Sequence, residues 1–536
     1  MADSGASIIT PDQLAALMAG AAPHALLDLR ERGAYETGQI FRATSLPRRQ
    51  LEVRLPALVT ARNSPLVLCD DDDGLAALAL PTIAEMGYAD VRILAGGLAA
   101  WRARDRATVQ GVNVPSKVFC ERALHEMRTP QISPRELEAR IRRGADMVIV
   151  DARTPEEYAR GCIPGAWSVP GGDLVLRIGE LVERPDTTIV VHCGGRTRSY
   201  IGAESLRRMQ LPNPVVALEN GTMGWELAGL QLERGASRWA PSASARSREA
   251  AAGVAERVAA EEGVRFLDPD DLERLWRRRD RENVYILDVR AREEYEAGHL
   301  PGAIWAPGGQ AVQATDDYIA VRAASVVLAC DGSARSVMTA AWLMRMGFPK
   351  VSVLRGGIGA WAEAGGAAEQ GHPVTVPFGY ERARGHVAAV AAGPLGEAAI
   401  LNVDPSDGYR RGHVPGAAWL CRSRLELRID AVAPDRSRPL VVTCADGVQS
   451  ALAAATLLGM GYAAARVLDG GTRAWAEAGL PVESGPTRLL DEPDDVVFKP
   501  YEKGREALEA YLRWEETLDL EGRSPNALIP SREGRR

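Results

Sequence analysis

One pattern, repeated four times along the chain, restricts the possible folds more than any other feature of the sequence. Each copy contains an apolar run ending in an acidic residue, a second apolar run ending in a cysteine, and a third followed by small residues and a tryptophan. The cysteines that end the second run are Cys69, Cys193, Cys330 and Cys444. Successive cysteines are separated by enough chain for one small domain. The sequence therefore predicts four copies of one domain.

Short apolar runs without alternation, separated by helical patterns, are typical of a parallel sheet covered on both faces. The predicted fold class is α/β: four tandem domains, each a small parallel sheet flanked by helices, plus a C-terminal helix. We call the domains units one to four. Their predicted boundaries are residues 1–110, 130–236, 264–371 and 380–485, and a C-terminal helical tail occupies residues 486–536.

Three segments lie between or after the units. The Val- and Pro-containing stretch that carries Cys120 is predicted to be a linker between units one and two. Residues 241–263 are predicted to be a second linker, helical from about Arg246. The amphipathic pattern at residues 501–518 predicts a helix. We expect this helix to dock on unit four or on a partner subunit, in a possible homodimer, rather than to take part in catalysis.

The composition argues against several classes of protein. The formal net charge of −7 is small for 536 residues, so nothing indicates nucleic-acid binding. The seven cysteines are scattered without metal-ligand spacing, which argues against a disulfide framework or a metal site and favours a reducing compartment. The sequence shows no leader pattern and no apolar stretch long enough to cross a membrane. We therefore expect a cytoplasmic protein without a membrane partner.

The loop after the second apolar run of unit two carries the strongest chemical signal. A β-branched run ends at Cys193, a loop rich in Gly and Arg follows, and a helical pattern then begins. A strand, a tight loop and a helix N-terminus leave backbone N–H groups that stabilise an anion. A thiolate is such an anion, so we expect Cys193 to have a lowered pKa and a nucleophilic sulfur; the alternative is an inert, buried thiol. The candidate anion-binding residues are Gly194, Gly195, Arg196, Thr197, Arg198 and Ser199.

The four loops differ in charge, and the differences rank them. Unit three keeps an arginine, Arg335, but adds an acidic residue after its cysteine, and unit four has Gln449 in place of the arginine. Unit one places four aspartates after its cysteine, and like charges raise the pKa of a thiol and repel an anionic substrate. We predict Cys193 as the main catalytic residue, Cys330 and Cys444 as second-rank candidates, and unit one as inactive.

The motifs, in this order, resemble those of the rhodanese (sulfurtransferase) family. The shared features are Asp-x-Arg after the first run, Gly-His-x-Pro-Gly-Ala in the next turn, Cys-x4-Arg-Ser at the loop, and Gly-Gly followed by Trp. The resemblance covers nearly the whole chain and implies a cysteine that takes a sulfane sulfur from thiosulfate or 3-mercaptopyruvate. It further implies that the cysteine persulfide passes the sulfur to cyanide, a thiol or a protein thiol. No cofactor is needed, because sulfur itself is the carried group.

A second arginine bears on the binding of this small anionic donor. Aligned from the turn, Arg54, Arg177 and Arg428 fall at the same place, whereas unit three has Ala314 there. Such an arginine could lie across the pocket and bind the donor, and the alternative is a surface salt bridge. Only unit two combines this arginine with one in the loop, which again favours Cys193.

Two other functions compete with sulfur transfer. A cysteine-dependent phosphatase of the same fold class needs a longer loop with Arg six positions after Cys, but Ser199, Ser336 and Ser450 occupy that position. The shorter loop suits a sulfur atom better than a phosphate. The other alternative is a non-catalytic array of rhodanese-like units that only bind or regulate partners. Unit one fits that description, whereas the complete loop of unit two argues against it for the whole chain.

Two pairs of residues in the first motif are expected to have a structural role. Asp151 and Arg153 in unit two, and Asp288 and Arg290 in unit three, are predicted to form ion pairs near the sheet edge. The tryptophans that end the repeats are expected to belong to the core.

The histidines and remaining cysteines also receive structural interpretations. His299 and His413 lie in turns and are expected to hydrogen-bond backbone groups rather than act as bases. His192 precedes the catalytic candidate, so its side chain points to the opposite face of the strand and is expected to be packed. Cys162 and Cys421 are expected to be buried rather than to act as resolving thiols.

Overall fold

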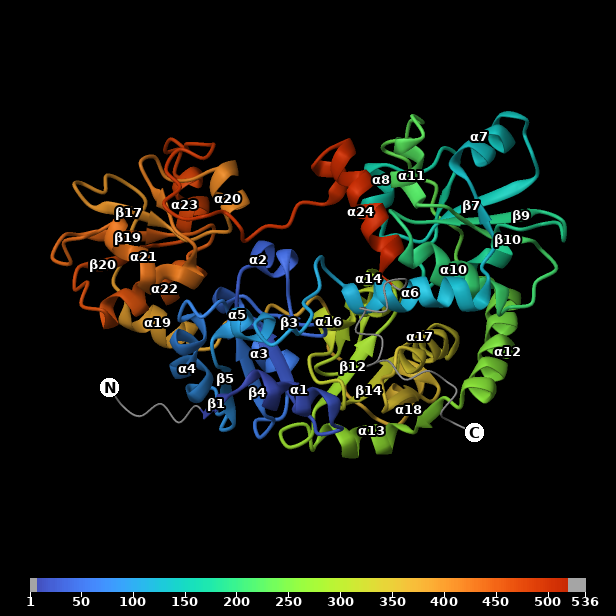
Figure 1. The fold of residues 1–536 in the computed structure, drawn as a ribbon, viewed down its shortest axis with the longest axis horizontal. Helices are drawn as coiled ribbons and strands as arrows, with labels where there is room; N and C mark the ends of the chain where they lie inside the picture. The colour runs from blue at the N-terminus through green and yellow to red at the C-terminus, as the bar shows by residue number, and fades with distance from the viewer. Residues whose placement is uncertain (1–6, 519–536) are drawn as a thin grey trace.

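The computed structural model describes residues 7–518, which contain four five-stranded parallel sheets, one in each unit (Figure 1). All four sheets have the same strand order, and the strand that leads to the unit's cysteine is always the central one. This arrangement confirms the predicted fold class. In sheet order the strands are, in unit one, β1 (Ser7–Ile9), β5 (Val91–Leu94), β4 (Leu66–Cys69), β2 (Ala25–Asp28) and β3 (Thr44–Ser45); in unit two, β6 (Gln131–Ile132), β10 (Val215–Leu218), β9 (Thr188–His192), β7 (Met147–Asp151) and β8 (Trp167–Ser168); in unit three, β11 (Arg265–Leu267), β15 (Val351–Leu354), β14 (Ser325–Ala329), β12 (Val284–Asp288) and β13 (Ile304–Trp305); and in unit four, β16 (Ala389–Val390), β20 (Ala465–Leu468), β19 (Leu440–Thr443), β17 (Ala399–Asn402) and β18 (Ala418–Trp419).

Helices connect the strands, as parallel sheets require. The helix after the cysteine loop is the longest of those within each unit, and its N-terminus faces the loop. Within the units the α-helices are α1 (Pro11–Ala19), α2 (Arg32–Thr37), α3 (Leu51–Leu58), α4 (Leu75–Glu85) and α5 (Gly97–Arg102); α7 (Pro134–Arg142), α8 (Pro155–Arg160), α9 (Leu174–Arg177), α10 (Thr197–Arg207) and α11 (Gly221–Leu227); α13 (Pro269–Trp276), α14 (Arg292–Ala297), α15 (Gly308–Gln313), α16 (Thr315–Tyr318), α17 (Ala334–Arg345) and α18 (Gly357–Glu363); and α19 (Tyr380–His386), α20 (Ser406–Arg411), α21 (Leu425–Arg428), α22 (Val448–Gly459) and α23 (Gly471–Glu477).

A glycine after the last strand of each unit packs against the loop that follows the central strand; it is the second residue of Gly-Gly in units one, three and four and of Asn220-Gly221 in unit two. In unit two, Gly221 has φ of 52°, and a Cβ there would lie 2.3 Å from the carbonyl oxygen of Cys193. In unit three, Gly357 has φ of 62°, and the corresponding distance to the Cys330 oxygen is 2.0 Å. Only glycine combines this left-handed conformation with so close a backbone approach. The tryptophan of the motif is buried in all four units, as predicted: Trp101, Trp225, Trp361 and Trp475.

Units two and three pack against each other as one pair, and units one and four pack through the equivalent surfaces as a second. Units one and three also meet, through an ion pair of 2.8 Å between Arg32 and Asp317 among other contacts. Between units two and three, two glycine-containing segments cross so closely that a Cβ on Gly172 would lie 3.0 Å from the backbone nitrogen of Gly308. The equivalent segments of units one and four meet through polar groups instead, including an ion pair of 2.5 Å between Arg48 and Glu426. Glycine therefore permits close backbone contact in the first pair, whereas charged side chains separate the second.

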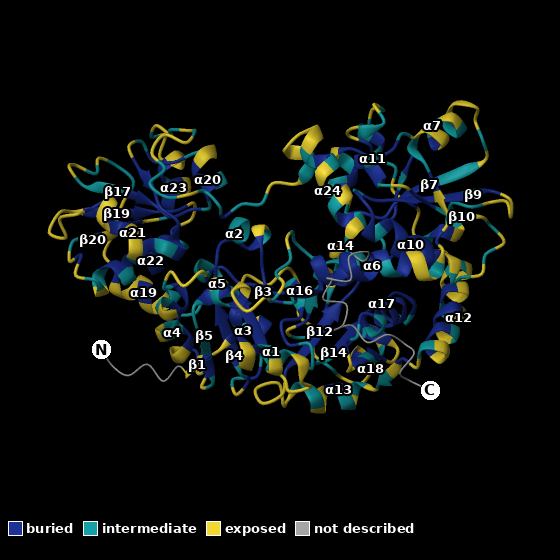
Figure 2. Cartoon of the chain, viewed as in Figure 1, coloured by how far each residue is buried: buried dark blue, intermediate teal, exposed yellow. Residues whose placement is uncertain are grey.

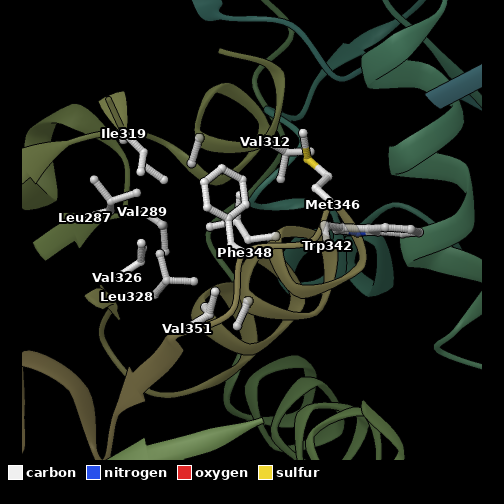
Figure 3. Close-up of a cluster of buried hydrophobic side chains, with 14 of the residues drawn as sticks. Leu287, Val289, Val312, Ile319, Val326, Leu328, Trp342, Met346, Phe348 and Val351 are labelled. Carbon is white, nitrogen blue, oxygen red and sulfur yellow. The ribbon is translucent and has the colours of Figure 1, made fainter. Parts of the chain in front are cut away.

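One apolar core runs through units one to three, and unit four has its own (Figure 2). Figure 3 shows the part of the shared core that lies in unit three, where sheet residues such as Leu287 and Leu328 lie near Phe348. Trp342 on α17 extends this core into unit two, because its indole N–H donates to the hydroxyl of Ser205 at 2.9 Å. Its ring also meets Phe119 edge-on, with centroids 6.0 Å apart. Units two and three are thus joined through a common interior.

The segment predicted to be a linker between units one and two is instead a buried helix, α6 (Val114–Met127), which corrects that expectation. Pro115 lies in its first turn, where proline is tolerated, so the proline did not mark a loop. The helix packs between units one, two and three, and apolar residues on several of its faces are therefore buried. The linker expected to be helical from about Arg246 is confirmed as α12 (Ala245–Glu262).

The C-terminal helix is confirmed as α24 (Arg505–Thr517), but its predicted docking surface was wrong. The chain leaves unit four, crosses to the other side of the molecule and places α24 on unit two (Figure 1). Leu508 and Leu512 pack there against Met223 of α11. An amphipathic pattern predicts that a helix has a face to bury but does not identify the surface that covers it. None of the described helices combines the length and apolar character needed to span a membrane.

Candidate active site

Cys193 directly follows the central strand of unit two, at the entrance to the loop predicted to be catalytic. The strand β9 is buried, Cys193 itself is 2% exposed, and α10 begins four residues later at Thr197. Within residues 7–518, the backbone N–H groups from Gly194 to Ser199 donate to no protein acceptor. The Cys193 sulfur lies 3.5 Å from the Ser199 hydroxyl oxygen. These donors form a site for negative charge around the sulfur.

Arg198 is held beside the loop by a carboxylate. Its guanidinium donates to both carboxylate oxygens of Glu157 on α8, at 2.6 and 2.8 Å, and approaches the Gln310 side chain of unit three at 3.5 Å. Burial acts to raise the pKa of Glu157, but Arg198 outweighs it and lowers that pKa to about 2. Burial likewise acts against the charge of Arg198, whereas Glu157 and the Cys193 sulfur raise its pKa. A fixed positive charge therefore stands near Cys193.

The guanidinium of Arg196 makes contacts both in the protein interior and on the side of the loop that faces α24. One edge of its guanidinium donates to both oxygens of Glu121 on α6, at 2.6 and 2.7 Å. The remaining nitrogen, Nη1, donates to the side chains of Asn220 at 2.8 Å and Glu516 at 3.1 Å. Glu121 is only 1% exposed. Most of Arg196 thus anchors the loop to α6, and one nitrogen is left on the side where α24 lies.

Replacing Arg196 with alanine is expected to destabilise the protein by about 3 kcal/mol, because it leaves the charge of Glu121 buried without a partner. Urea denaturation of the full chain measures this change. The double variant Arg196→Ala/Glu121→Gln is expected to recover part of the lost stability, since no buried charge is then left without a partner. Equal stability of the Arg196→Ala variant and the native chain would contradict the anchoring role.

Helix α24 covers the loop from the outside. Glu515, which is 2% exposed, accepts a hydrogen bond of 3.2 Å from the Thr197 hydroxyl. A Cβ built on Gly195 would lie 3.5 Å from the other carboxylate oxygen of Glu515. Burial raises the pKa of the Tyr511 phenol well above its usual range, and Glu515 and the Cys193 sulfur add to the rise. The turn of α24 that carries Tyr511 and Glu515 is therefore part of the surroundings of Cys193.

In unit one an aspartate takes the place of the loop cysteine. The sheet pairs Cys69 with Asp28 as it pairs His192 with Asp151, so Asp70, not Cys69, is equivalent to Cys193. The prediction that grouped Cys69 with the loop cysteines was therefore wrong. The buried carboxylate of Asp70 accepts hydrogen bonds from the backbone N–H groups of Asp72 at 3.0 Å and Ala76 at 2.9 Å. An external anion would need the same donors. Burial also raises the pKa of the Cys69 thiol well above its usual range, with a further contribution from Asp28. This geometry favours the prediction that unit one is inactive.

In unit three the loop arginine is surrounded by carboxylates. Arg335 is 2% exposed and pairs with Glu294 at 2.6 Å, with Asp331 at 2.7 Å and with Asp173 of unit two at 3.0 Å. Burial raises the pKa of the Cys330 thiol, although Arg335 acts in the opposite direction. Three acidic partners leave little positive charge with which Arg335 could attract an anionic substrate.

In unit four an acidic side chain again reaches the loop. Asp446 accepts a hydrogen bond of 3.0 Å from the backbone N–H of Val448, and the Cys444 sulfur lies 3.6 Å from the same carboxylate oxygen. The sulfur also lies 3.4 Å from the Ser450 hydroxyl. Burial raises the pKa of the Cys444 thiol. Of the four loops, only that of unit two contains no acidic residue.

Four segments of the chain match the family model described as the rhodanese-like domain, at residues 10–104, 133–228, 271–364 and 388–478. Together these segments make up most of the sequence. The chain belongs to the rhodanese-like family.

A solved structure and two other sulfurtransferases extend this identification. The crystal structure of thiosulfate sulfurtransferase from Pseudomonas aeruginosa matches 98% of this chain and 99% of its own, with a TM-score of 0.90 and 38% sequence identity. The 3-mercaptopyruvate sulfurtransferase of Escherichia coli K12 is 27% identical over 249 residues, covering 37% of this chain and 87% of that protein. The thiosulfate sulfurtransferase of Azotobacter vinelandii is 31% identical over 185 residues, covering 30% of this chain and 67% of that protein. This rhodanese-like chain is an enzyme of the sulfurtransferase class.

Of the arginines predicted to lie across the pocket, Arg177 has other partners and Arg428 lies at the surface. Arg177 is half-buried and pairs with Asp173 at 3.1 Å, and it donates to the backbone carbonyl of Ala240 at 3.1 Å. Neither contact belongs to the Cys193 loop, so the ion-pair alternative describes Arg177 better. Arg428 is exposed and lines a cavity of about 760 Å³ between units one and four, together with Arg424. In this rhodanese-like chain, Arg198 therefore supplies the charge near Cys193.

The predicted structural ion pairs are confirmed. Arg153 pairs with Asp151 at 2.7 Å in unit two, and Arg290 pairs with Asp288 at the same distance in unit three. Each arginine also donates to the carbonyl of the glycine in the following turn, so the Asp-x-Arg motif ties the strand end to that turn.

The histidine predictions are also confirmed. The ring Nδ1 atoms of His299 and His413 lie 2.8 and 2.7 Å from backbone carbonyl oxygens, which requires the tautomer protonated at that nitrogen. Burial lowers the pKa of His192 to about 4, although Asp151 acts in the opposite direction, so His192 is a neutral, packed side chain. Cys162 and Cys421 are buried, as expected.

Several residues around Cys193 were not identified from the sequence. Glu121 and Asn220 hold Arg196, and Tyr511 and Glu515 come from a helix more than 300 positions further along the chain. The clearest available signal was the uninterrupted helical pattern around Glu121, which the neighbouring proline obscured. Nothing local to the tail connected Glu515 with unit two.

Proposed function

We propose that this chain transfers a sulfane sulfur through a persulfide on Cys193, from thiosulfate or 3-mercaptopyruvate to cyanide or a thiol. The observation that carries the proposal is the set of N–H donors from Gly194 to Ser199, which no carboxylate of their own loop occupies. In unit one, by contrast, Asp70 takes the equivalent donors. The likeness to sulfurtransferases named for these two donors supports the choice of substrates.

The reaction with thiosulfate proceeds in two displacements at sulfur. The Cys193 thiolate attacks the outer sulfur of thiosulfate, the S–S bond of the donor breaks, and sulfite leaves with the electron pair. The outer sulfur is then bound to Cys193 as a persulfide anion. Cyanide attacks that sulfur and leaves as thiocyanate, which returns the electron pair and the negative charge to Cys193. A thiolate acceptor leaves as its own persulfide in the same way.

With 3-mercaptopyruvate the bond that breaks is C–S. The pyruvate enolate takes the electron pair, its methylene carbon takes up the proton of the substrate thiol, and pyruvate leaves. In both reactions the negative charge stays beside the same N–H groups and Arg198, so the loop does not need to rearrange between the thiolate and the persulfide.

Mass spectrometry after exposure to donor tests this proposal. The full chain is treated with thiosulfate in the absence of acceptor, alkylated and digested. We expect one additional sulfur atom on the peptide that carries Cys193, and its loss when cyanide is added before alkylation. Additional sulfur only on the Cys330 or Cys444 peptides would assign the chemistry to another unit, and unmodified peptides throughout would favour a binding array.

A further inference from the structure

The carboxylates of α24 occupy groups that an anionic donor would use. Glu515 accepts from the Thr197 hydroxyl at 3.2 Å, and Glu516 lies 3.1 Å from Nη1 of Arg196 and 3.3 Å from the side-chain nitrogen of Asn220. Thiosulfate presents sulfonate oxygens, which make the same kinds of hydrogen bond as a carboxylate. A helix carrying two negative charges therefore stands at the entrance to a loop built to bind anions.

Glu515 is a buried carboxylate on an otherwise apolar helix face. One of its oxygens accepts from the Thr197 hydroxyl, and the Tyr511 phenol of the same helix is the group that interacts with the carboxylate from the helix side. A buried carboxylate opposes the apolar packing that holds the helix against unit two. Hence Glu515 and the hydrophobic contacts of Leu508 and Leu512 act on α24 in opposite directions.

We propose that α24 competes with the anionic sulfur donor for the Cys193 loop. The donor binds there only when Glu515 and Glu516 move away from it. The proposal rests on the function assigned to Cys193. The route of the chain is consistent with such a movement. The connector from unit four is held on units four and one as far as Asp495, and the residues between Asp495 and Arg505 cross to the helix (Figure 1). The apolar side chains of α24 hold the helix against unit two, and its two carboxylates bind the groups that the sulfur donor would use.

The double variant Glu515→Gln/Glu516→Gln tests the competition, because it keeps the shape of the helix and removes both charges. We expect the KM for thiosulfate to fall by about three- to tenfold with kcat little changed, since a neutral amide competes less well for cationic and N–H groups. We also expect sulfite, the product anion, to protect Cys193 from iodoacetamide at a correspondingly lower concentration. Glu506→Gln is the matched control, because Glu506 is an exposed residue on the same helix.

The two readouts separate this inference from the proposed function. If thiosulfate supports no turnover that depends on Cys193, the proposed function fails, and sulfite protection still decides whether α24 competes. A KM and a protecting sulfite concentration equal to those of Glu506→Gln, or a KM that rises, would overturn the inference. A chain that ends at Gly504 lacks α24 and is expected to shift both readouts in the same direction. If that truncated chain does not fold, the double variant decides.

Discussion

Replacing Cys193 with serine is expected to abolish thiosulfate:cyanide sulfurtransferase activity, lowering kcat/KM by at least about 10³-fold. A hydroxyl in place of the thiol cannot form the persulfide, and the serine oxygen is a far weaker nucleophile at neutral pH. The variant is expected to fold, because serine is nearly isosteric and Cys193 lies beside Ser199, which can share a hydrogen bond with it. Thiocyanate formation measures the rate.

The other loop cysteines provide matched controls for this experiment. Cys330→Ser and Cys444→Ser make the same substitution at equivalent positions, and both are expected to retain activity within about twofold of the native chain. Full activity of Cys193→Ser, together with its loss in either control, would place the chemistry in unit three or four. Activity in none of the proteins, with either donor, would leave the non-catalytic array as the better description.

Units two and one differ in what occupies the N–H donors of the same loop. Both loops follow a central strand and precede a helix, and both receive a glycine against their backbone. In unit one Asp70 takes the position that Cys193 has in unit two, and its carboxylate accepts from the N–H groups of its own loop. The Asp70 carboxylate belongs to the chain itself, so its binding to the loop costs no translational or rotational entropy of association. It therefore competes well with a free anion. Unit one therefore lacks both a thiol at this position and a free set of N–H donors.

The features that were predictable from the sequence are those set by local pattern. Apolar runs, turns and the repeated motifs specify the order of strands and helices within one unit, and four repetitions made that prediction secure. The Asp151–Arg153 ion pair was also predictable, because two residues at the end of a strand are close in any fold. For the same reason the loop after Cys193 was identified with its N–H donors.

The features that were not predictable depend on contacts between distant segments. Arg196 was expected to bind substrate, but most of its guanidinium is taken by Glu121, a residue 75 positions earlier on a helix that looked like a linker. The pairing of unit two with unit three and of unit one with unit four depends on which surfaces match, and every unit shares the same motifs. The position of α24 likewise follows from surface complementarity, not from its own sequence.

The glycine behind the active loop leads to the second large prediction. Gly221→Ala is expected to destabilise the chain by about 4 kcal/mol, because alanine is strained at positive φ and its methyl group would overlap the carbonyl of Cys193. Relief of that overlap must move either the loop or the α11 N-terminus. A shift of the sulfur and its N–H donors by a fraction of an ångström is expected to lower kcat/KM by about 10²-fold.

Gly357→Ala separates the two effects. The same clash exists in unit three, where a Cβ would lie 2.0 Å from the Cys330 oxygen, so a similar loss of stability is expected in urea denaturation. Because the proposed function places the chemistry in unit two, the folded fraction of Gly357→Ala is expected to keep nearly native kcat/KM under conditions where both variants remain folded. Equal losses of activity in the two variants would mean that sulfur transfer depends on both loops, and that units two and three act as one catalytic pair.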